Sequence, residues 1–497
     1  MILTAEDLAR RYFADGRVEG LPTGHFIHGA TVAGATGETI ESLDPGLARP
    51  FAAFPAGNAA DIERAVESAQ KGLSAWRDTA PAERCRVLNR VANVIRERSD
   101  YLAFVETLDS GKTLAEARGD VQSAIRCFEY YAGAADKLEG RSIPLGPGLA
   151  SWTEREPVGI TAHIIPWNYP TSTFARGVAP ALAAGCAAIV KPAETTPFTA
   201  LILATWLLEA GLPAGVLNVV TGFGLDAGAP LVRHPSISHV TFTGSVATGI
   251  GAMQAAAVNV TGLTLELGGK SPLIALADCD LDRAVDGALW AIFSNAGQIC
   301  SAGSRLVVER PIHDRMLKRL AEKARALRLG HGLSPAAEVG AINSKLHLDR
   351  IAAHVDAARR RGCRIITGGQ ATVDDETGQG WFFEPTIIDG ASVNDPAVQD
   401  EIFGPVLTVQ VVDSEEDAIE VANGTEFGLV AGIYTRDIGK ALKIARRVEA
   451  GQVTINDYWA GGIEVPFGGT KKSGFGREKG LEGIDAYTRT KAITIRH

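Results

Sequence analysis

From Val158 onward the chain alternates short apolar runs with helical segments, and this alternation restricts the fold more than any other feature. The expected strands are 159–165, 187–191, 216–220 and 239–243, and helices are expected over 198–210 and 227–233. Strand–helix–strand repetition is typical of a doubly wound parallel sheet. A second stretch of the same texture, over about 284–447, predicts another α/β unit. We therefore expect an α/β fold.

The two ends of the chain differ in texture from the middle. Residues 1–58 are rich in Gly, Pro and short β-like runs, which favours hairpins there. Apolar residues then recur at helical spacing from Asp61, and helices are expected at intervals up to residue 132. The tail, 485–496, has the composition of an edge strand. Such a terminal strand often completes a sheet across a subunit interface.

Charge and cysteine content argue against several classes of protein. The formal net charge of the 497 residues is −9 and no basic stretch is present, which argues against binding to nucleic acid or an anionic membrane. The six cysteines are scattered without a Cys-x-x-Cys pair, which argues against a disulfide framework and a zinc site, so we expect no metal. The first 20 residues lack an apolar signal core, and the longest apolar run contains Pro180 and Gly185. We expect a cytoplasmic protein.

One cysteine lies in a segment that suits a nucleophile. Cys300 stands among small residues in the segment Asn-Ala-Gly-Gln-Ile-Cys-Ser-Ala-Gly-Ser, 295–304, which would let a substrate approach the sulfur. A thiol needs a lowered pKa or a neighbouring base to react near pH 7. A free cysteine is also commonly a small buried apolar residue, and we prefer that interpretation for the other five. For Cys300 both interpretations remain open.

Two polar residues follow expected strands. Glu266 lies between two leucines in Leu-Glu-Leu-Gly-Gly-Lys-Ser-Pro, 265–272, where burial would raise its pKa and suit a general base. An exposed carboxylate, or one paired with Lys270, is the alternative. Asn168 ends the strand in Ile-Ile-Pro-Trp-Asn-Tyr-Pro, 164–170, and its amide could donate to an oxyanion or merely cap a turn.

Three further segments could bind a dinucleotide. Lys191 and Glu194 follow a strand and could hold the two hydroxyls of a ribose, or form a surface ion pair. The turns 222–228 and 242–249 contain several glycines after a strand and before a helix, where backbone N–H groups can contact a phosphate. Neither turn matches Gly-x-Gly-x-x-Gly, and glycine in a turn often serves only backbone geometry.

These segments together, in this order, resemble the aldehyde dehydrogenase superfamily from about Phe26 to the C-terminus. Two more of the family's motifs are present, Glu-Ile-Phe-Gly-Pro over 401–405 and Pro-Phe-Gly-Gly over 466–469 with Ser-Gly-Phe-Gly-Arg over 473–477. The resemblance implies a Rossmann-like cofactor domain from 1–137 and 158–265, and a catalytic α/β domain from 266–470. It also implies a bridging β-arm from 138–157 and 471–497 that builds homodimers or homotetramers.

The resemblance also assigns roles to single residues. It implies that Cys300 is the nucleophile, that Glu266 is the base, and that Asn168 and the Cys300 N–H form the oxyanion hole. The residues expected to contact NAD(P) are Ile164, Pro166, Trp167, Lys191, Glu194, Gly224, Gly244, Ser245, Leu267, Glu401 and Phe403. The expected substrate pocket comprises Tyr169, Thr173, Arg176, Ser294, Ile299, Ser301, Gly461 and Phe467.

The resemblance implies oxidation of an aldehyde to an acid through a thioester on Cys300. Glu194 would repel a 2′-phosphate and so favours NAD over NADP, although Lys191 could partly offset this effect. Residues 171–177 and Ser294 depart from the large apolar residues that are usual in the family, which indicates a wide tunnel for a bulky or aromatic aldehyde. Arg176 either attracts an anionic tail or covers the surface.

Three rival functions remain. Relatives that transfer the acyl group to coenzyme A generally lack the base at Glu266, whose presence favours hydrolysis. A catalytically silent protein of this fold is disfavoured by the presence of Cys300, Glu266 and Asn168 together. A cysteine hydrolase ranks last, because the nearest downstream histidine is His313 and no local Cys–His pair is present.

Overall fold

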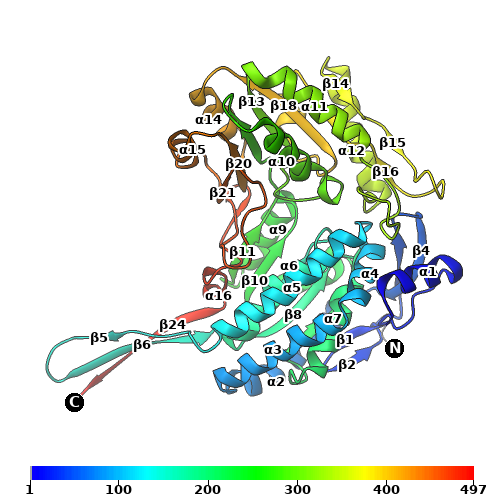
Figure 1. Ribbon diagram of the computed structural model, residues 1–497. Helices are drawn as coiled ribbons and strands as arrows, with labels where there is room; N and C mark the ends of the chain where they lie inside the picture. Colours follow the sequence, from blue (N-terminus) through cyan, green and yellow to red (C-terminus); the bar gives the residue numbers. More distant parts are fainter. Residues whose placement is uncertain (1–2) are drawn as a thin grey trace.

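The computed structural model describes residues 3–497, which form two α/β units and a projecting β-arm (Figure 1). The first unit is built on an eight-stranded sheet with the order β2-β1-β9-β8-β7-β10-β11-β23. Its parallel strands are β7 (Ile160–Ile165), β8 (Ala187–Pro192), β9 (Leu217–Val219), β10 (Ile237–Thr243) and β11 (Gly262–Glu266). The antiparallel members are β1 (His25–Ile27), β2 (Ala30–Val32) and β23 (Gly474–Phe475). The predicted α/β fold is confirmed.

Helices cover both faces of this first sheet. They are α2 (Ala59–Arg77), α3 (Pro81–Glu97), α4 (Ser99–Ser110), α5 (Leu114–Ala134), α6 (Pro170–Ala184), α7 (Phe198–Glu209), α8 (Ala229–Arg233) and α9 (Val246–Ala257). A π-helical turn, η1 (Gly224–Gly228), precedes α8, so the helix expected over 227–233 begins in a wider turn. α6 starts with Pro170 in its first turn and ends at Gly185, whose φ of 94° stops the helix.

The second unit is a seven-stranded sheet with the order β14-β17-β18-β13-β12-β20-β21. Its strands are β12 (Pro272–Ala275), β13 (Arg305–Glu309), β14 (Arg364–Thr367), β17 (Thr386–Asp389), β18 (Val406–Val412), β20 (Val430–Tyr434) and β21 (Gln452–Ile455), and only β14 is antiparallel. The covering helices are α10 (Leu281–Phe293), α11 (His313–Ala326), α12 (Lys345–Arg360), α13 (Pro396–Gln399), α14 (Glu415–Asn423) and α15 (Ile438–Ala445). The sheet therefore begins before, and ends after, the stretch expected from the sequence.

The arm is a three-stranded antiparallel sheet that extends away from the body of the molecule (Figure 1). It consists of β5 (Ser142–Ile143), β6 (Leu149–Pro157) and β24 (Thr488–Arg496) in the order β24-β6-β5. Nine residues of β24 pair with β6, from Thr488 opposite Pro157 to Arg496 opposite Leu149. The expected terminal strand is thus present, and segments more than 300 residues apart in the chain build one sheet.

The N-terminal region contains two hairpins, as hairpins were expected there, and one helix that was not expected. The hairpins are β1–β2 and β3 (Thr39–Asp44) with β4 (Arg49–Pro55). α1 (Ala5–Asp15) precedes them, so the prediction of hairpins alone was wrong for these residues. Thr4 and Asp7 cap this helix reciprocally, and burial of Tyr12 holds it against α4. The capping signal was in the sequence, but the Gly- and Pro-rich surroundings outweighed it.

The remaining short elements join these parts. They are η2 (Ser294–Gly297), η3 (Arg310–Ile312), β15 (Ala371–Thr372), β16 (Phe382–Phe383), β19 (Phe427–Gly428), β22 (Thr470–Lys471) and α16 (Glu482–Asp485). Within residues 3–497, no helix is both long and apolar enough to cross a membrane.

Candidate active site

Cys300 lies in a tight loop between α10 and β13. Asn295, Ala296 and Gly297 all have positive φ, so the chain turns sharply before it reaches the cysteine. The Gln298 side chain holds this turn, because its Nε2 donates to the Asn295 carbonyl (3.1 Å) and its Oε1 accepts from the Asn343 N–H (2.9 Å). The sulfur is therefore carried by a loop with fixed geometry.

Two glycines let distant motifs reach this loop. A Cβ on Gly269 would lie 2.4 Å from the Cys300 carbonyl oxygen, and a Cβ on Gly297 would lie 2.1 Å from the Gly404 carbonyl oxygen. Both distances are far below any normal contact, so only glycine fits either position. The motifs 265–272, 295–304 and 401–405 are thereby in direct contact, although the sequence places them up to 140 residues apart.

Glu266 is buried at the end of β11, and both of its carboxylate oxygens lack a hydrogen-bond partner among residues 3–497. Burial raises its pKa well above the usual range, and the neighbouring Glu478 carboxylate raises it further, while Arg176 opposes the shift. The alternatives of an exposed Glu266 or a pair with Lys270 are wrong for this structure. The Glu266 carbonyl accepts from the Gly244 N–H (3.1 Å), which joins it to a predicted phosphate turn.

The thiol of Cys300 is partly buried, and its surroundings keep it protonated. Burial raises the pKa of Cys300 to about 12, and the charge of Arg176 acts in the opposite direction. The charges of Glu401 and Glu266 raise it further. Such a thiol reacts only when a base accepts its proton.

Asn168 points toward the cysteine loop. Its Nδ2 donates to the Gln298 carbonyl (2.9 Å), and Asn295 Nδ2 donates to the Asn168 carbonyl (3.2 Å). These bonds use one of the two N–H groups of the Asn168 amide and fix its orientation. The other N–H remains available for an oxyanion beside the sulfur.

Several of the predicted cofactor residues lie along the carboxyl ends of the first sheet. Lys191 is opposite Ile164 in the β7–β8 register, and its Nζ lies 3.3 Å from Glu194 Oε2. Lys191 is buried whereas the Glu194 side chain is 41% exposed, so this pair borders an open surface. Pro166 and Trp167 follow β7 directly. The carboxyl ends of parallel strands are the usual position for a dinucleotide.

The turn after β9 has room for a ligand, and the turn after β10 leads into an exposed helix N-terminus. A Cβ on Gly224 would meet nothing within 4 Å. Gly244 precedes Ser245, which caps α9 through a bond from the Thr248 N–H (3.3 Å) and leaves the helix N-terminus exposed. Leu267 donates its N–H to the Ser473 carbonyl (3.0 Å). These turns offer backbone donors to an anion.

Two aromatic residues predicted to contact the cofactor also contact each other. The rings of Trp167 and Phe403 have centroids 5.2 Å apart, in an edge-to-face arrangement. Phe403 has a φ of 59°, and its carbonyl accepts from His347 Nε2 (2.7 Å). Glu401 Oε1 accepts from the Gly269 N–H (2.9 Å), and burial raises the pKa of Glu401 to about 7. The predicted nicotinamide end is therefore assembled from both units.

Tyr169, Cys300 and Ile299 share one apolar cluster with Phe467, which brings part of the predicted substrate pocket together. Ser301 accepts a hydrogen bond from Tyr458 through its carbonyl (2.8 Å). The other predicted pocket residues are Thr173, buried in the first turn of α6, Ser294, whose Oγ donates to the Trp290 carbonyl, and Gly461, exposed with a φ of 111°.

Arg176 does not cover the surface, and that alternative is wrong. Its guanidinium forms an ion pair with the buried Glu478 carboxylate and lies 4.8 Å from the centre of the Phe467 ring. Glu478 and its neighbour Lys479 were missed by the sequence analysis. They directly follow the quoted motif 473–477, which was the available signal.

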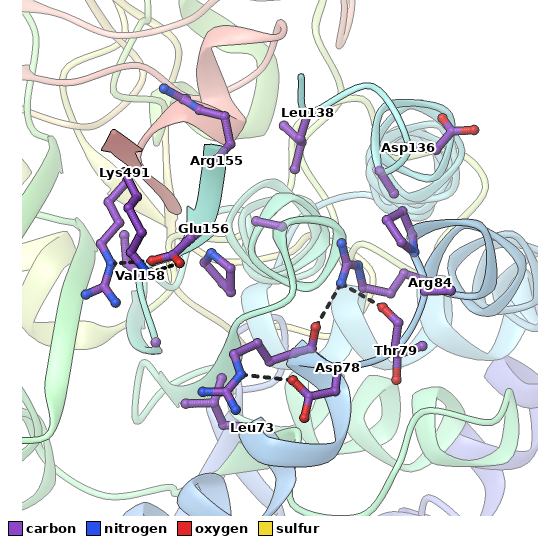
Figure 2. Close-up of a pocket in the computed structure, with 18 residues that line it drawn as sticks. Leu73, Asp78, Thr79, Arg84, Asp136, Leu138, Arg155, Glu156, Val158 and Lys491 are labelled. Atoms are coloured by element: carbon purple, nitrogen blue, oxygen red, sulfur yellow. Dashed lines mark hydrogen bonds and ion pairs between the residues drawn. The ribbon is translucent and has the colours of Figure 1, made fainter. Parts of the chain in front are cut away.

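A separate cavity of about 740 Å³ lies at the root of the arm. Figure 2 shows its lining by the α2–α3 turn, where Arg84 Nη1 donates to the Thr79 carbonyl (2.9 Å), and by the arm, where Glu156 pairs with Lys491. Among the described residues that line it, none belongs to the predicted site. The cavity is therefore distinct from the candidate active site.

Comparison with known proteins supports this geometry. The family model described as "Aldehyde dehydrogenase family" matches residues 32–493. An aldehyde dehydrogenase of Aspergillus niger is 39% identical over 477 residues, covering 96% of this chain and 95% of that protein. A hydroxyisobutyraldehyde dehydrogenase of Mycolicibacterium austroafricanum is 40% identical over 470 residues, covering 95% and 93%. The chain therefore belongs to the aldehyde dehydrogenase family.

Solved structures lead to the same class. A crystal structure of indole-3-acetaldehyde dehydrogenase with NAD⁺ superposes with a TM-score of 0.96 at 38% identity, over 100% of both chains. The predicted family and fold are confirmed, and the protein is an oxidoreductase that acts on aldehydes. The NAD predicted from the sequence is the cofactor bound in that relative.

Proposed function

We propose that this enzyme oxidises a bulky or aromatic aldehyde to the carboxylic acid with NAD, through a thioester on Cys300 that water hydrolyses with Glu266 as base. The observation that carries the proposal is the convergence of the Cys300 loop, Glu266 and Asn168. A close contact at Gly269 holds the Glu266 segment against this loop, and Asn168 is hydrogen-bonded to it. Sulfur, carboxylate and amide donor are the groups that thioester chemistry requires.

In the first half of the reaction the sulfur binds the aldehyde carbon. The thiol loses its proton to a base as the C–S bond forms, and the carbonyl oxygen becomes an oxyanion. The free N–H of Asn168 and the backbone N–H of Cys300 stabilise that charge. One hydride must then leave the carbon, and bound NAD supplies its acceptor. The enzyme is left as a thioester.

In the second half Glu266 acts on water. Its raised pKa makes the carboxylate a stronger base, because a group with a higher pKa binds a proton more tightly. The water loses a proton to Glu266 as its oxygen attacks the thioester carbon. The C–S bond then breaks, the sulfur leaves as a thiolate, and the acid is released. Transfer to coenzyme A would not require this base, so Glu266 favours hydrolysis.

The residues present fit NAD. Lys191 and Glu194 supply a donor and an acceptor for a ribose, and Gly224 leaves open space where a side chain would project. The exposed N-terminus of α9 at Ser245 suits a phosphate. A partly exposed carboxylate at Glu194 would repel a 2′-phosphate. We therefore expect a higher kcat/KM with NAD than with NADP.

The preference for large aldehydes rests on small residues among those predicted to line the substrate pocket. Gly461 has no side chain, and Ser294 turns its hydroxyl onto the Trp290 carbonyl. A panel of acetaldehyde, benzaldehyde and a carboxylated aldehyde would test this preference by kcat/KM. A clear preference for acetaldehyde would contradict it.

The Glu266→Gln variant tests the mechanism. We expect acylation to proceed and hydrolysis to stall, so intact-protein mass spectrometry after one turnover should show an acyl adduct on Cys300. The steady-state rate should fall by about 100-fold or more, in line with loss of a general base. Glu322→Gln, an exposed position on α11, is the matched control. An unchanged steady-state rate in Glu266→Gln would refute this role.

We also propose a homodimer or homotetramer joined through the arm, in a reducing compartment such as the cytoplasm. All six cysteines are free, as expected for such a compartment. The arm exposes apolar side chains, including Leu145 and Ile495, that a second copy could cover.

A further inference from the structure

Two cationic side chains flank the Phe467 ring at the wall of the candidate substrate pocket. The guanidinium carbon of Arg176 lies 4.8 Å from the ring centre, and Lys479 Nζ lies 5.3 Å from it. Phe467 belongs to the apolar cluster against which Tyr169 and Cys300 pack. Both cations therefore lie against a ring of the same apolar cluster against which Cys300 packs.

The charges at this wall do not balance. Glu478 is buried and forms an ion pair with Arg176, so this carboxylate and this guanidinium neutralise each other. The Lys479 side chain has no ion-pair or hydrogen-bond partner among residues 3–497, and its Nζ lies over the Phe467 ring. Of the other nearby carboxyl groups, Glu464 is exposed and pairs with Arg126, and Glu266 is buried with a pKa raised well above its usual range, which favours its neutral form. One positive charge is left over at Lys479.

Lys479 is enclosed but can still be reached. Its side chain is only partly exposed, and burial together with the charge of Arg176 lowers its pKa to about 8. Cys127 and Cys300 both lie close enough to Lys479 to interact with it electrostatically. An enclosed cation without a counter-ion is costly, and a bound anion would remove that cost.

We propose that Lys479, supported by Arg176, binds a carboxylate at the far end of the aldehyde substrate. This inference rests on the proposed function and names its substrate class, an aldehyde whose ring or chain ends in a carboxylate. The aldehyde carbon would meet Cys300, the body of the substrate would pack on Phe467, and the carboxylate would pair with Lys479. Arg176 remains engaged by Glu478 and adds long-range attraction.

The kinetic test compares 4-formylbenzoate with its neutral methyl ester, which has a similar ring and aldehyde. For the unmodified enzyme with NAD⁺, kcat/KM should be about 10- to 100-fold higher for the carboxylate, the size of one charge-assisted contact. Lys479→Met should remove this preference, mainly by raising KM for the carboxylate, and should leave kcat/KM for the ester within about twofold of its value in the unmodified enzyme. Lys479→Arg should restore it, and Lys472→Met, at an exposed lysine paired with Glu426, should change neither substrate.

A binding measurement separates the inference from the proposed function. Isothermal titration with terephthalate and with benzoate needs no turnover, and only terephthalate carries the second carboxylate. The Kd of terephthalate should be at least about 10-fold lower for the unmodified enzyme than for Lys479→Met. The Kd of benzoate should be the same for both proteins.

Equal binding of terephthalate to both proteins would overturn the inference, as would an unmodified enzyme that prefers the ester. A uniform loss with both aldehydes in Lys479→Met, without rescue by arginine, would also overturn it by showing a structural role. Lys479-dependent binding of terephthalate without oxidation of either aldehyde would overturn the proposed function alone.

Discussion

At the scale of single residues, burial sets the reactivity of the site. Cys300 and Glu266 both have raised pKa values because the protein withholds water from their charged forms. Each is thereby a poor acid, so the thiol stays unreactive until a base takes its proton and the carboxylate binds a proton firmly once it is charged. The charge of the Arg176 guanidinium opposes both shifts.

Alkylation of Cys300 should therefore rise steeply with pH. The thiolate fraction of a thiol with a pKa of about 12 rises about tenfold for each pH unit at every pH below that pKa. The rate of inactivation by iodoacetamide, measured from pH 6 to 10 without NAD, should increase without a plateau. Cys300→Ser should show no corresponding adduct by peptide mass spectrometry. A plateau below pH 9 would contradict the shift.

At the scale of elements, close backbone contacts at glycine fix how the segments meet. Gly269→Ala would place a Cβ 2.4 Å from the Cys300 carbonyl oxygen and push the nucleophile loop away. We expect kcat/KM to fall by about 100-fold, the cost of a misplacement near 1 Å, with the fold retained by circular dichroism. Gly119→Ala, in α5 with nothing within 4 Å of its Cβ, should keep full activity. Comparable loss in both variants would refute the steric argument.

A buried histidine pair links the arm to the first sheet. His163 on β7 and His239 on β10 both have rings against Tyr487, which precedes β24, with centroids 5.8 and 5.5 Å away. Burial lowers the pKa of His163 to about 3 and that of His239 to about 4. Both histidines are therefore neutral in the folded protein at pH 5, whereas in the unfolded chain they are charged below about 6.5.

The histidines should make the fold sensitive to acid. The unfolded chain takes up protons that the folded protein does not, so stability is lost as the pH falls below about 6.5. Each histidine should lower the free energy of unfolding by about 2 kcal/mol between pH 7 and pH 5. His163→Gln should reduce the pH dependence of the free energy of unfolding by that amount in urea titrations, whereas His497→Gln, at the exposed C-terminus, should not. An identical pH dependence in His163→Gln would disprove this linkage.

At the scale of the whole molecule, the arm is the part least able to stand alone. It is a thin sheet outside both cores, and Ile495 on β24 is 49% exposed (Figure 1). We expect light scattering to give a particle mass of two or four times 52.3 kDa. Ile495→Asp should lower that mass, because a charge would be buried in the contact, whereas Val393→Asp, exposed far from the arm in sequence, should leave it unchanged. A monomer mass for the unmodified protein would contradict the proposal.

The sequence alone determined the elements whose periodicity is local, such as β7, β8 and β10, and the motifs around Cys300 and Glu266. These features follow from residue type and spacing over about ten positions, because a strand or a turn depends chiefly on its own residues and immediate neighbours. The helix α1 was not predicted for the same reason, because its few helical signals competed with nearby Gly and Pro.

Only the tertiary structure decided which residues share an environment. It buried Arg176 against Glu478 rather than exposing it, and it left the Lys479 side chain without an ion pair among residues 3–497. Burial and charge pairing depend on contacts between residues hundreds of positions apart, and spacing along the chain carries no measure of those distances. The reactive residues of this site could therefore be predicted from local sequence, whereas their electrostatic environment depends on the packing of the whole molecule.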